Sequence, residues 1–243
     1  MTESEQLFES FCAARQLSFQ RIQECDGKSP DYRLCLQDTE IIVEVKQIEP
    51  NAEEKQLLNM PPEEWDAENV YHWGIPGDRI RKKIADALPQ LKALSREKVP
   101  TLLVVYDVVK VWPELADDYA VKVAMYGIES ALISSAVAPE GGARILRRWY
   151  GPRRRLTSQH NTTLSGIAVM ASRDGAEIGM RVYHNYFAAN VLPKTKLILP
   201  GILQFELEAE PEGRFPDWKP IRTPKEALCA AARKVRRGSS RDR

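Results

Sequence analysis

The sequence predicts a soluble α/β or α+β protein, and three observations lead to this fold class. The composition is that of a globular protein, because 43% of the 243 residues are hydrophobic and 28% are charged, which excludes a disordered or fibrous chain. Two segments carry apolar residues at helical spacing, and several others are apolar at alternate positions or continuously, as strands are. The length suits one large domain, or a core of about 100–150 residues with an appended segment.

The first expected elements are a helix and a β-hairpin. The spacing predicts an amphipathic helix over residues 4–16, whose apolar stripe consists of Leu7, Phe8, Phe11, Cys12 and Ala14. Residues 26–30 are of turn-forming types and precede two short runs, 32–36 and 40–48, that have the composition of strands. We therefore expect these two runs to pair as a hairpin.

The middle of the chain predicts an irregular excursion followed by a helix and a strand. Residues 49–77 are rich in Pro and Glu, which indicates a long irregular segment that is either mobile or a lid. Residues 78–96 show a helix repeat, and residues 101–109 form an apolar run typical of a buried strand. Together with the strand at 40–48, they predict a strand–helix–strand unit.

The second half of the chain is less regular in pattern. A helix is expected within residues 114–135, and strands are expected at 143–150, 164–172 and 178–185. Residues 191–222 contain five prolines and show no clear period. Beyond them, a Thr-Pro-Lys-Glu string with a potential N-cap, an early Pro and a capping-box acid predicts a helix over 223–235.

The distribution of apolar and charged residues bears on location and partners. No apolar stretch approaches the eighteen or so residues of a membrane span, and the N-terminus lacks a signal-peptide pattern, so a cytoplasmic protein without a membrane partner is expected. The net charge is only +1, so global electrostatics does not identify a polyanionic partner. Basic residues nevertheless cluster locally, at 79–83, 147–155 and 233–243.

Two charged residues lie in a strand that otherwise has the pattern of a buried one. In the run 40–48, Glu44 and Lys46 share a face with isoleucines, and an unpaired charge in such a place is costly. The hairpin register that places Tyr32 on the same face as Val43 sets Asp31 opposite Glu44. Cross-strand neighbours have Cβ atoms about 4.5–5.5 Å apart, so the two carboxylates could share one cation.

This arrangement suits the hydrolysis of a phosphodiester bond. Two carboxylates with water molecules fit Mg²⁺ or Mn²⁺, which prefer oxygen ligands. Lys46 follows Glu44 on the same face, and its flexible stem can return the ammonium toward a metal-bound water. Such a metal lowers the pKa of its bound water, and the ammonium stabilises charge that develops during an in-line displacement. An exposed hairpin edge with solvated charges is the alternative interpretation.

The string Pro30-Asp31, twelve intervening residues and Glu44-Val45-Lys46 resembles the signature of the PD-(D/E)xK, or restriction-endonuclease-like, nuclease superfamily. The resemblance covers residues 1 to about 110. It implies a mixed central β-sheet flanked by helices and a nuclease-like core over 1–112. The resemblance says nothing about the rest of the chain, and we expect residues 113–243 to form a C-terminal α+β extension packed on that core as part of one globular unit. The resemblance also implies that Asp31 and Glu44 are metal ligands and that Lys46 is the catalytic lysine.

The resemblance suggests further site residues. Many members add a glutamate from the first helix, which Glu5 matches best because it borders the apolar face more closely than Glu9 does. Gln47 and Gln90 stand where related nucleases sometimes place an active-site glutamine.

The basic clusters have two interpretations each. Arg79, Arg81 and Lys82 could contact phosphates, or could form the ordinary polar face of a helix. Arg153, Arg154 and Arg155 follow an aromatic pair, as on nucleic-acid surfaces, or could form the rim of an exposed hairpin.

The sequence thus predicts a metal-dependent nuclease whose partner is nucleic acid, with DNA expected. The alternative is a catalytically idle module that retains the fold and binds nucleic acid or takes part in an assembly. A homo-oligomer is compatible with either function.

Overall fold

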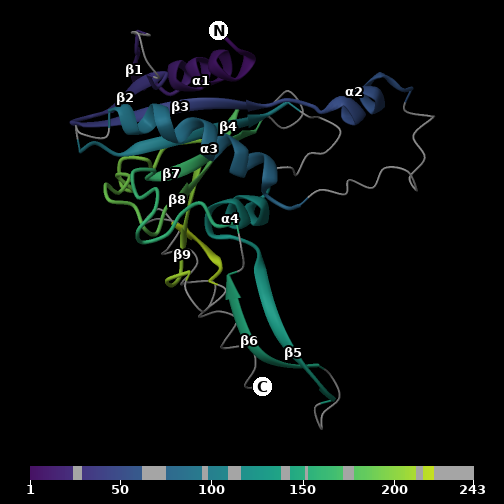
Figure 1. Ribbon diagram of the computed structural model, residues 1–243. Coiled ribbons are helices and arrows are strands. Elements are labelled where there is room, and N and C mark those ends of the chain that lie inside the picture. The colour runs from purple at the N-terminus through teal and green to yellow at the C-terminus, as the bar shows by residue number, and fades with distance from the viewer. Residues whose placement is uncertain are drawn as a thin grey trace, which may run out of the picture.

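A mixed β-sheet with helices on both faces forms the body of the protein, as a computed structural model shows, and the described residues contribute eight strands to it (Figure 1). The structure describes residues 1–23, 29–61, 75–94, 98–108, 116–137, 143–150, 153–171, 178–211 and 216–221. The strand order is β1-β2-β3-β4-β7-β8-β9-β10, and it contains both parallel and antiparallel neighbours. The α/β class and the mixed sheet flanked by helices, which the sequence predicts, are therefore confirmed.

The N-terminal elements follow the predicted order. Helix α1 (Glu3–Ala14) begins with a capping box, in which Thr2 and Glu5 bond each other's backbone N–H groups. Strands β2 (Tyr32–Leu36) and β3 (Thr39–Ile48) form the expected antiparallel hairpin, with Tyr32 paired to Val43. A short strand that the sequence does not indicate, β1 (Ser18–Arg21), pairs with β2. Its four residues are too few and too exposed to show the alternation of apolar and polar residues that indicates a strand.

The next elements complete the strand–helix–strand unit. Along the sequence, helix α3 (Asp78–Ala93) follows β3 and precedes β4 (Thr101–Asp107). In the sheet, β4 pairs parallel to β3. Helix α2 (Ala52–Asn59) interrupts the segment for which the sequence predicts irregular structure. Most of the remaining excursion, and with it the possible lid, lies outside the described residues.

The sheet continues beyond residue 112. Strand β7 (Gly166–Ala171) pairs parallel to β4, and β8 (Gly179–His184) pairs antiparallel to β7. Strands β9 (Ile202–Leu207) and β10 (Trp218–Ile221) extend the sheet within a stretch whose prolines obscure any period. The helix predicted over 223–235 lies outside the described residues.

The helix that the sequence predicts within residues 114–135 occupies only part of that segment. Helix α4 (Asp118–Tyr126) ends at Gly127, and the chain then enters β5 (Glu129–Val137). Gly127 adopts φ 94°, a conformation that stops the helix and that other residues rarely adopt. None of the helices among the described residues is both long and apolar enough to cross a membrane.

Two hydrophobic cores lie on opposite faces of the sheet. Helix α1 packs on the face that carries Ile41, Val43 and Val45 of β3. Helices α3 and α4 cover the other face, which carries Ile42 and Ile48. The alternation of β3 thus places Glu44 and Lys46 on the side of the sheet that α3 covers.

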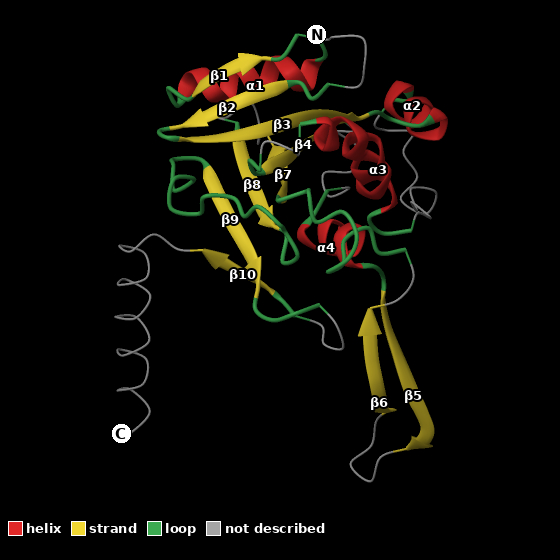
Figure 2. Cartoon of the chain, turned by 60° about the vertical axis from the view of Figure 1, so that its left-hand side comes forward, coloured by secondary structure: helices red, strands yellow, loops and turns green. Residues whose placement is uncertain are grey.

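A separate two-stranded sheet projects from the body. Strand β5 pairs antiparallel with β6 (Ala143–Tyr150), and the resulting hairpin extends away from the large sheet in both views (Figures 1 and 2). We refer to β5 and β6 together as the arm. Its base is tied to α4, because the backbone N–H groups of Arg155 and Leu156 donate to the carbonyl of Met125 at 3.1 and 2.8 Å.

Candidate active site

Asp31 lies where β2 begins, beside the middle of β3. The paired residues of the hairpin end at Tyr32 and Val43, so Asp31 is one step beyond, next to Glu44. The backbone N–H of Val45 donates to Oδ2 of Asp31 at 2.8 Å, which fixes the carboxylate against the strand that carries Glu44 and Lys46. Burial raises the pKa of Asp31, while the Val45 N–H and Lys46 oppose that rise.

Glu44 is the most unusual residue of this region, because its carboxylate is fully buried. Within the described part of the chain, neither of its side-chain oxygens has a hydrogen-bond partner, although the Lys46 ammonium forms an ion pair with Oε1. Burial raises the pKa of Glu44 to about 7, and the negative charge of Asp31 adds to the rise, whereas Lys46 opposes it. Glu44 is therefore a carboxyl group that is poised to gain or lose a proton near neutral pH.

Lys46 connects this buried carboxylate to the solvent. Its side chain is 24% exposed while its ammonium contacts Glu44. Lys83 of α3 lies close enough for the charge of Lys46 to lower its pKa, although burial of Lys83 is the larger cause and Asp86 opposes it. A second ammonium group, that of Lys83, thus lies near the ammonium of Lys46.

Lys83 belongs to a basic stretch of the sequence, and the motif alone does not identify it as a site residue. The signal that could have identified it is helical spacing, because Lys83 precedes Gln90 by seven residues and both lie on one stripe of α3. Gln90 donates from Nε2 to the carbonyl of Ser29 at 3.3 Å, which ties α3 to the segment just before Asp31. This stripe of α3 therefore borders the candidate site.

The donors present fit one hard cation. The carboxylate oxygens of Glu44, of which Oε1 also pairs with Lys46, and the adjacent carboxylate of Asp31 are the ligand type that Mg²⁺ and Mn²⁺ prefer. In the described ranges, no three side chains of His, Cys, Asp and Glu come together as a metal-binding group. Mg²⁺ commonly uses one or two carboxylates and takes its other ligands from water and phosphate, so two carboxylates are sufficient.

Glu5 lies near Asp31, but its carboxylate has other partners. Oε2 of Glu5 accepts from the Thr2 backbone N–H at 2.8 Å and from Arg21 at 3.2 Å. Its negative charge nevertheless contributes to the raised pKa of Asp31. Glu9 points elsewhere and accepts a hydrogen bond from the hydroxyl of Tyr32 at 2.9 Å.

Gln47 lies on the opposite face of β3 from Lys46. It accepts from the backbone N–H of Ser4 at 3.2 Å and donates to Glu49 at 2.7 Å. These contacts place it against the start of α1, so Gln47 is not beside Glu44, whereas Gln90 borders the site through Ser29.

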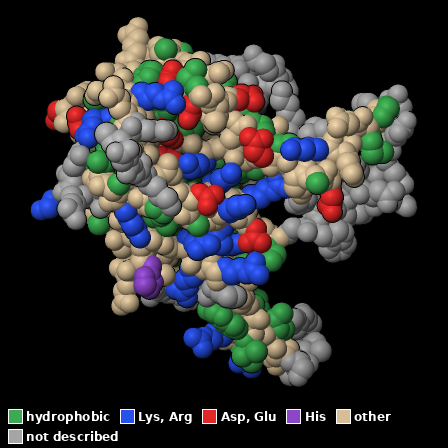
Figure 3. Space-filling view, turned by 45° about the horizontal axis from the view of Figure 1, so that its top comes forward, with side chains coloured by type: hydrophobic (Ala, Val, Ile, Leu, Met, Phe, Trp, Pro, Cys, Tyr) green, Lys and Arg blue, Asp and Glu red, His purple; other side chains and the backbone are tan. Residues whose placement is uncertain are grey.

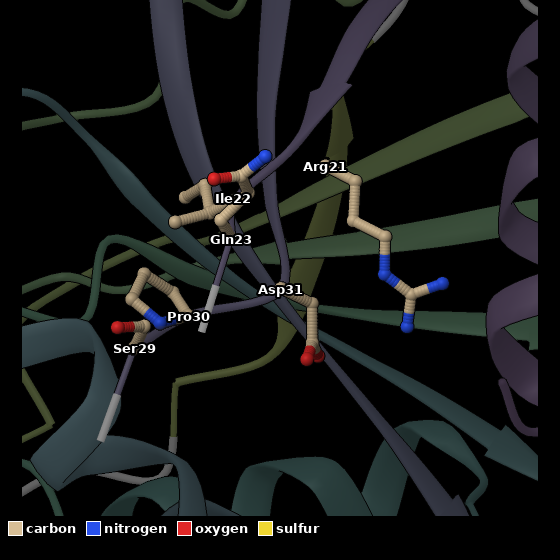
Figure 4. Close-up of a pocket in the computed structure, with 6 residues that line it drawn as sticks. All are labelled: Arg21, Ile22, Gln23, Ser29, Pro30 and Asp31. Carbon is tan, nitrogen blue, oxygen red and sulfur yellow. The ribbon is translucent and has the colours of Figure 1, made fainter. Parts of the chain in front are cut away.

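An accessible pocket of about 510 Å³ borders Asp31 (Figure 4). It is lined by residues of β1, of the segment after it and of the segment that leads into β2, namely Arg21, Ile22, Gln23, Ser29, Pro30 and Asp31. The backbone N–H of Ile22 donates to the carbonyl of Asp31 at 2.9 Å, which holds the two segments together. Arg21 and Asp31 thus bring opposite charges to one pocket.

The basic residues at the start of α3 differ in their surroundings. Arg79 donates to Glu54 at 2.6 Å and to the carbonyl of Glu49, and Lys82 is exposed. Arg81 is 4% exposed and donates to Asp78 and to the carbonyls of Pro76 and Val123, so its guanidinium is held inside the protein. The reason is spacing, because position 81 lies three residues before the buried Ile84 and shares its side of the helix.

The basic residues after the arm lie at its base. Arg153 is half exposed and pairs with Asp78 of α3 at 3.3 Å, and Arg154 is exposed. Arg155 is only partly exposed, and its backbone is bonded to α4.

Comparison of the chain with family models, with curated proteins and with solved structures found no match. The function of the protein is therefore inferred from the geometry of the site and from the resemblance of its sequence motif.

Proposed function

We propose that this protein is a Mg²⁺-dependent nuclease of the PD-(D/E)xK type that hydrolyses phosphodiester bonds of DNA. One observation carries the proposal: Glu44 is fully buried beside a second carboxylate, and within the described residues the contacts of its carboxylate oxygens with other side chains are limited to the ion pair with Lys46.

A purely structural ion pair is the main competing explanation for these residues. Removing charges from water costs several kcal/mol per ion, and structural pairs offset that cost with additional hydrogen bonds to the buried groups. Despite the ion pair with Lys46, the balance of these effects still raises the pKa of the buried Glu44 carboxyl, and the charge of Asp31 makes its ionised form less favourable. A bound divalent cation would offset both costs, which favours a metal site over a structural pair.

The order of elements supports the same proposal. Helix α1, the β2–β3 hairpin, helix α3 and the parallel strand β4 follow one another, with α1 and α3 on opposite faces of the sheet. This is the arrangement of a mixed sheet flanked by helices that the resemblance implies. The PD-(D/E)xK motif falls in it where the hairpin meets α3.

Each residue has a role in the proposed reaction. Asp31 and Glu44 would hold the metal, which when bound supplies positive charge to a phosphate oxygen and lowers the pKa of water. Lys46 reaches from the buried carboxylate toward solvent, so its ammonium can donate to a phosphate oxygen and stabilise the charge that develops there. Gln90 holds the segment that positions Asp31.

A cleavage assay with Mg²⁺ or Mn²⁺ tests the proposal on single-stranded, duplex and branched DNA and on RNA. Glu44→Gln and Lys46→Ala should each abolish cleavage while the fold persists, as circular dichroism would show. Glu40→Gln is the matched control, because Glu40 lies on the same strand with a side chain that is 46% exposed, and it should cut like the wild type. The proposal fails if the wild-type protein cuts none of these substrates and calorimetry detects no metal binding.

The alternative is a non-catalytic module that binds nucleic acid. It is favoured by the direct contact of Lys46 with Glu44, because the two charges already neutralise each other. Under this alternative, Asp31→Ala would leave DNA affinity unchanged and no cleavage would be seen for either protein. Under the nuclease proposal, the same substitution removes turnover that the wild type has.

A further inference from the structure

The arm has an exposed apolar surface and no packing partner among the described residues. Its two strands form a sheet of their own, and they extend from the body without a described helix or strand against either face (Figure 2). Leu132, Ile133 and Leu146 are each more than half exposed, and Ile145 is 42% exposed. An isolated two-stranded hairpin is at best marginally stable in water. Such a surface is typical of an interaction site.

Among the described side chains, those that carry a charge on the projecting part of the arm are basic. Arg144 and Arg147 of β6 are exposed, and the guanidinium of Arg147 lies 5.6 Å from the centre of the Trp149 ring. The acidic residue of β5, Glu129, is at the base and pairs with Lys122 of α4 at 3.2 Å. Apolar and basic side chains therefore occur together on the projecting part of the molecule (Figure 3). This combination suits an anionic partner.

Further basic residues connect the arm to the candidate active site. Arg153 at the base of the arm contacts the first residue of α3, Asp78. Lys82 is exposed one turn further along α3, and the charge of Lys83 couples to that of Lys46. An elongated anion could thus contact the arm, α3 and the site at once.

We propose that the arm enters the major groove of B-form duplex DNA and holds the duplex against α3, across the candidate active site. This inference rests on the proposed function and names its substrate class. Paired strands lie about 4.8 Å apart, and the major groove is about 12 Å wide, so a two-stranded ribbon with its side chains fits. Strands of eight or nine residues extend roughly 30 Å, which is enough to reach into the groove from the body.

The chemistry of the arm favours this occupant over two others. A second copy of the chain would bring like charges of Arg144 and Arg147 together, which is unfavourable at a symmetric contact. The major groove of A-form RNA is too deep and narrow for side chains to read. In B-form DNA, by contrast, arginines can contact phosphates or guanine, and Leu or Ile can contact the thymine methyl group.

Binding without metal tests the basic part of the arm, because it requires no turnover. The wild type, Arg144→Ala/Arg147→Ala and the control Lys219→Ala, an exposed lysine of β10, are titrated against a labelled duplex in EDTA by fluorescence anisotropy. Removing one arginine–phosphate interaction lowers the slope of log affinity against log salt by about 0.9, so the slope should fall by up to about 1.8 in the double variant. This variant should also bind more weakly at every salt concentration, whereas Lys219→Ala should match the wild type.

The apolar part of the arm is tested by Leu132→Ser/Leu146→Ser. The control is Leu203→Ser, which removes a leucine of β9 that is 60% exposed. We expect the arm variant to bind duplex DNA at least tenfold more weakly and to melt at the temperature of the wild type. The expected salt dependence is unchanged, because no charge is removed.

The outcomes separate this inference from the nuclease proposal. If duplex binding depends on the arm but no protein cleaves DNA, the groove-binding inference is supported and the nuclease proposal is overturned. If the wild type cleaves duplex DNA and the arm variants bind and cut it equally well, the groove-binding inference is overturned. Sedimentation that shows the wild type as a dimer and the arm variants as monomers also overturns it, as does equal arm dependence with duplex RNA of the same sequence.

Discussion

The carboxylate of Asp31 accepts a hydrogen bond from the backbone N–H of Val45 at 2.8 Å, and Val45 is the residue between Glu44 and Lys46. The contact links the segment before β2 to the centre of the Glu44-Val45-Lys46 string. It gives Asp31 a structural role that can be separated from its proposed role as a metal ligand.

Asp31→Asn and Asp31→Ala should separate these roles. Asn retains a side-chain oxygen for the Val45 N–H, so its free energy of unfolding should stay close to that of the wild type. Ala leaves this N–H without its partner and should cost about 1–3 kcal/mol, measured by urea denaturation. Both variants should lose Mg²⁺ binding and cleavage. If Asp31→Asn binds Mg²⁺ as tightly as the wild type by calorimetry, Asp31 is not a ligand.

Glu44 should make the metal-free protein less stable as pH rises. The pKa of Glu44 is raised from 4.5 to about 7 in the folded state. The free energy of unfolding should therefore be highest below pH 4.5, where the carboxyl is neutral in both states, and should fall as pH rises from 4.5 through about 7. Above pH 7 the burial of the charge should cost about 3 kcal/mol. Glu44→Gln should therefore be more stable than the wild type at pH 8 in EDTA, by thermal or urea denaturation.

The control for this pH dependence is Glu40→Gln, which should follow the wild-type stability profile from pH 4 to 8. A wild type and a Glu44→Gln variant with parallel profiles would show that Glu44 ionises normally.

Mg²⁺ should stabilise the wild-type protein and should bind more weakly in acid. A ligand that binds only the folded state adds about 2.7 kcal/mol at one hundred times its Kd. The metal competes with a proton at Glu44, so its affinity should fall about tenfold per pH unit below pH 7. Thermal melts with Mg²⁺ and with EDTA measure this, and Glu44→Gln serves as the metal-insensitive control. A shift in melting temperature of equal size in both proteins would place the metal elsewhere.

Neighbouring basic residues of α3 should behave differently when they are replaced. Arg81→Ala removes a buried guanidinium that bonds Asp78 and two backbone carbonyls, and should cost about 2–4 kcal/mol of stability. Lys82→Ala removes an exposed charge, so stability should stay within about 0.5 kcal/mol while DNA affinity falls. Urea denaturation and anisotropy measure the two effects. The opposite pattern, with Lys82 needed for stability and Arg81 dispensable, would contradict the burial seen in the structure.

The sequence predicts the hairpin and its register well because each position has a clear requirement. Tyr32, Ile41 and Val43 must share a buried face, and a shift of one residue would turn all of them outward. The same alternation places Glu44 and Lys46 together. The predicted proximity of Asp31 to Glu44 follows from this register and needs no information from distant parts of the chain.

Other features depend on contacts that local patterns do not encode. Spacing places Arg81 on the side of α3 that carries Ile84, but arginine is usually exposed, and the contact of Arg81 with the carbonyl of Val123 depends on the approach of α4. Strands β9 and β10 are short, contain or follow prolines, and are defined by their pairing with β8 and with each other. The projection of the arm likewise depends on where α4, which leads into it, places β5, and the composition of β5 does not reveal this.

The parallel pairing of β4 with β7 has a consequence for how the protein can be divided. A fragment that ended near residue 112 would leave β4 with an open edge and would strip Val121, Tyr126 and Tyr183 from the core beneath α3. Exposed apolar edge strands invite aggregation, so such a fragment is unsuitable for transplantation as a minimal catalytic unit. The segment that bears the acidic pair and the segment that follows β4 therefore share one continuous sheet and one core beneath α3.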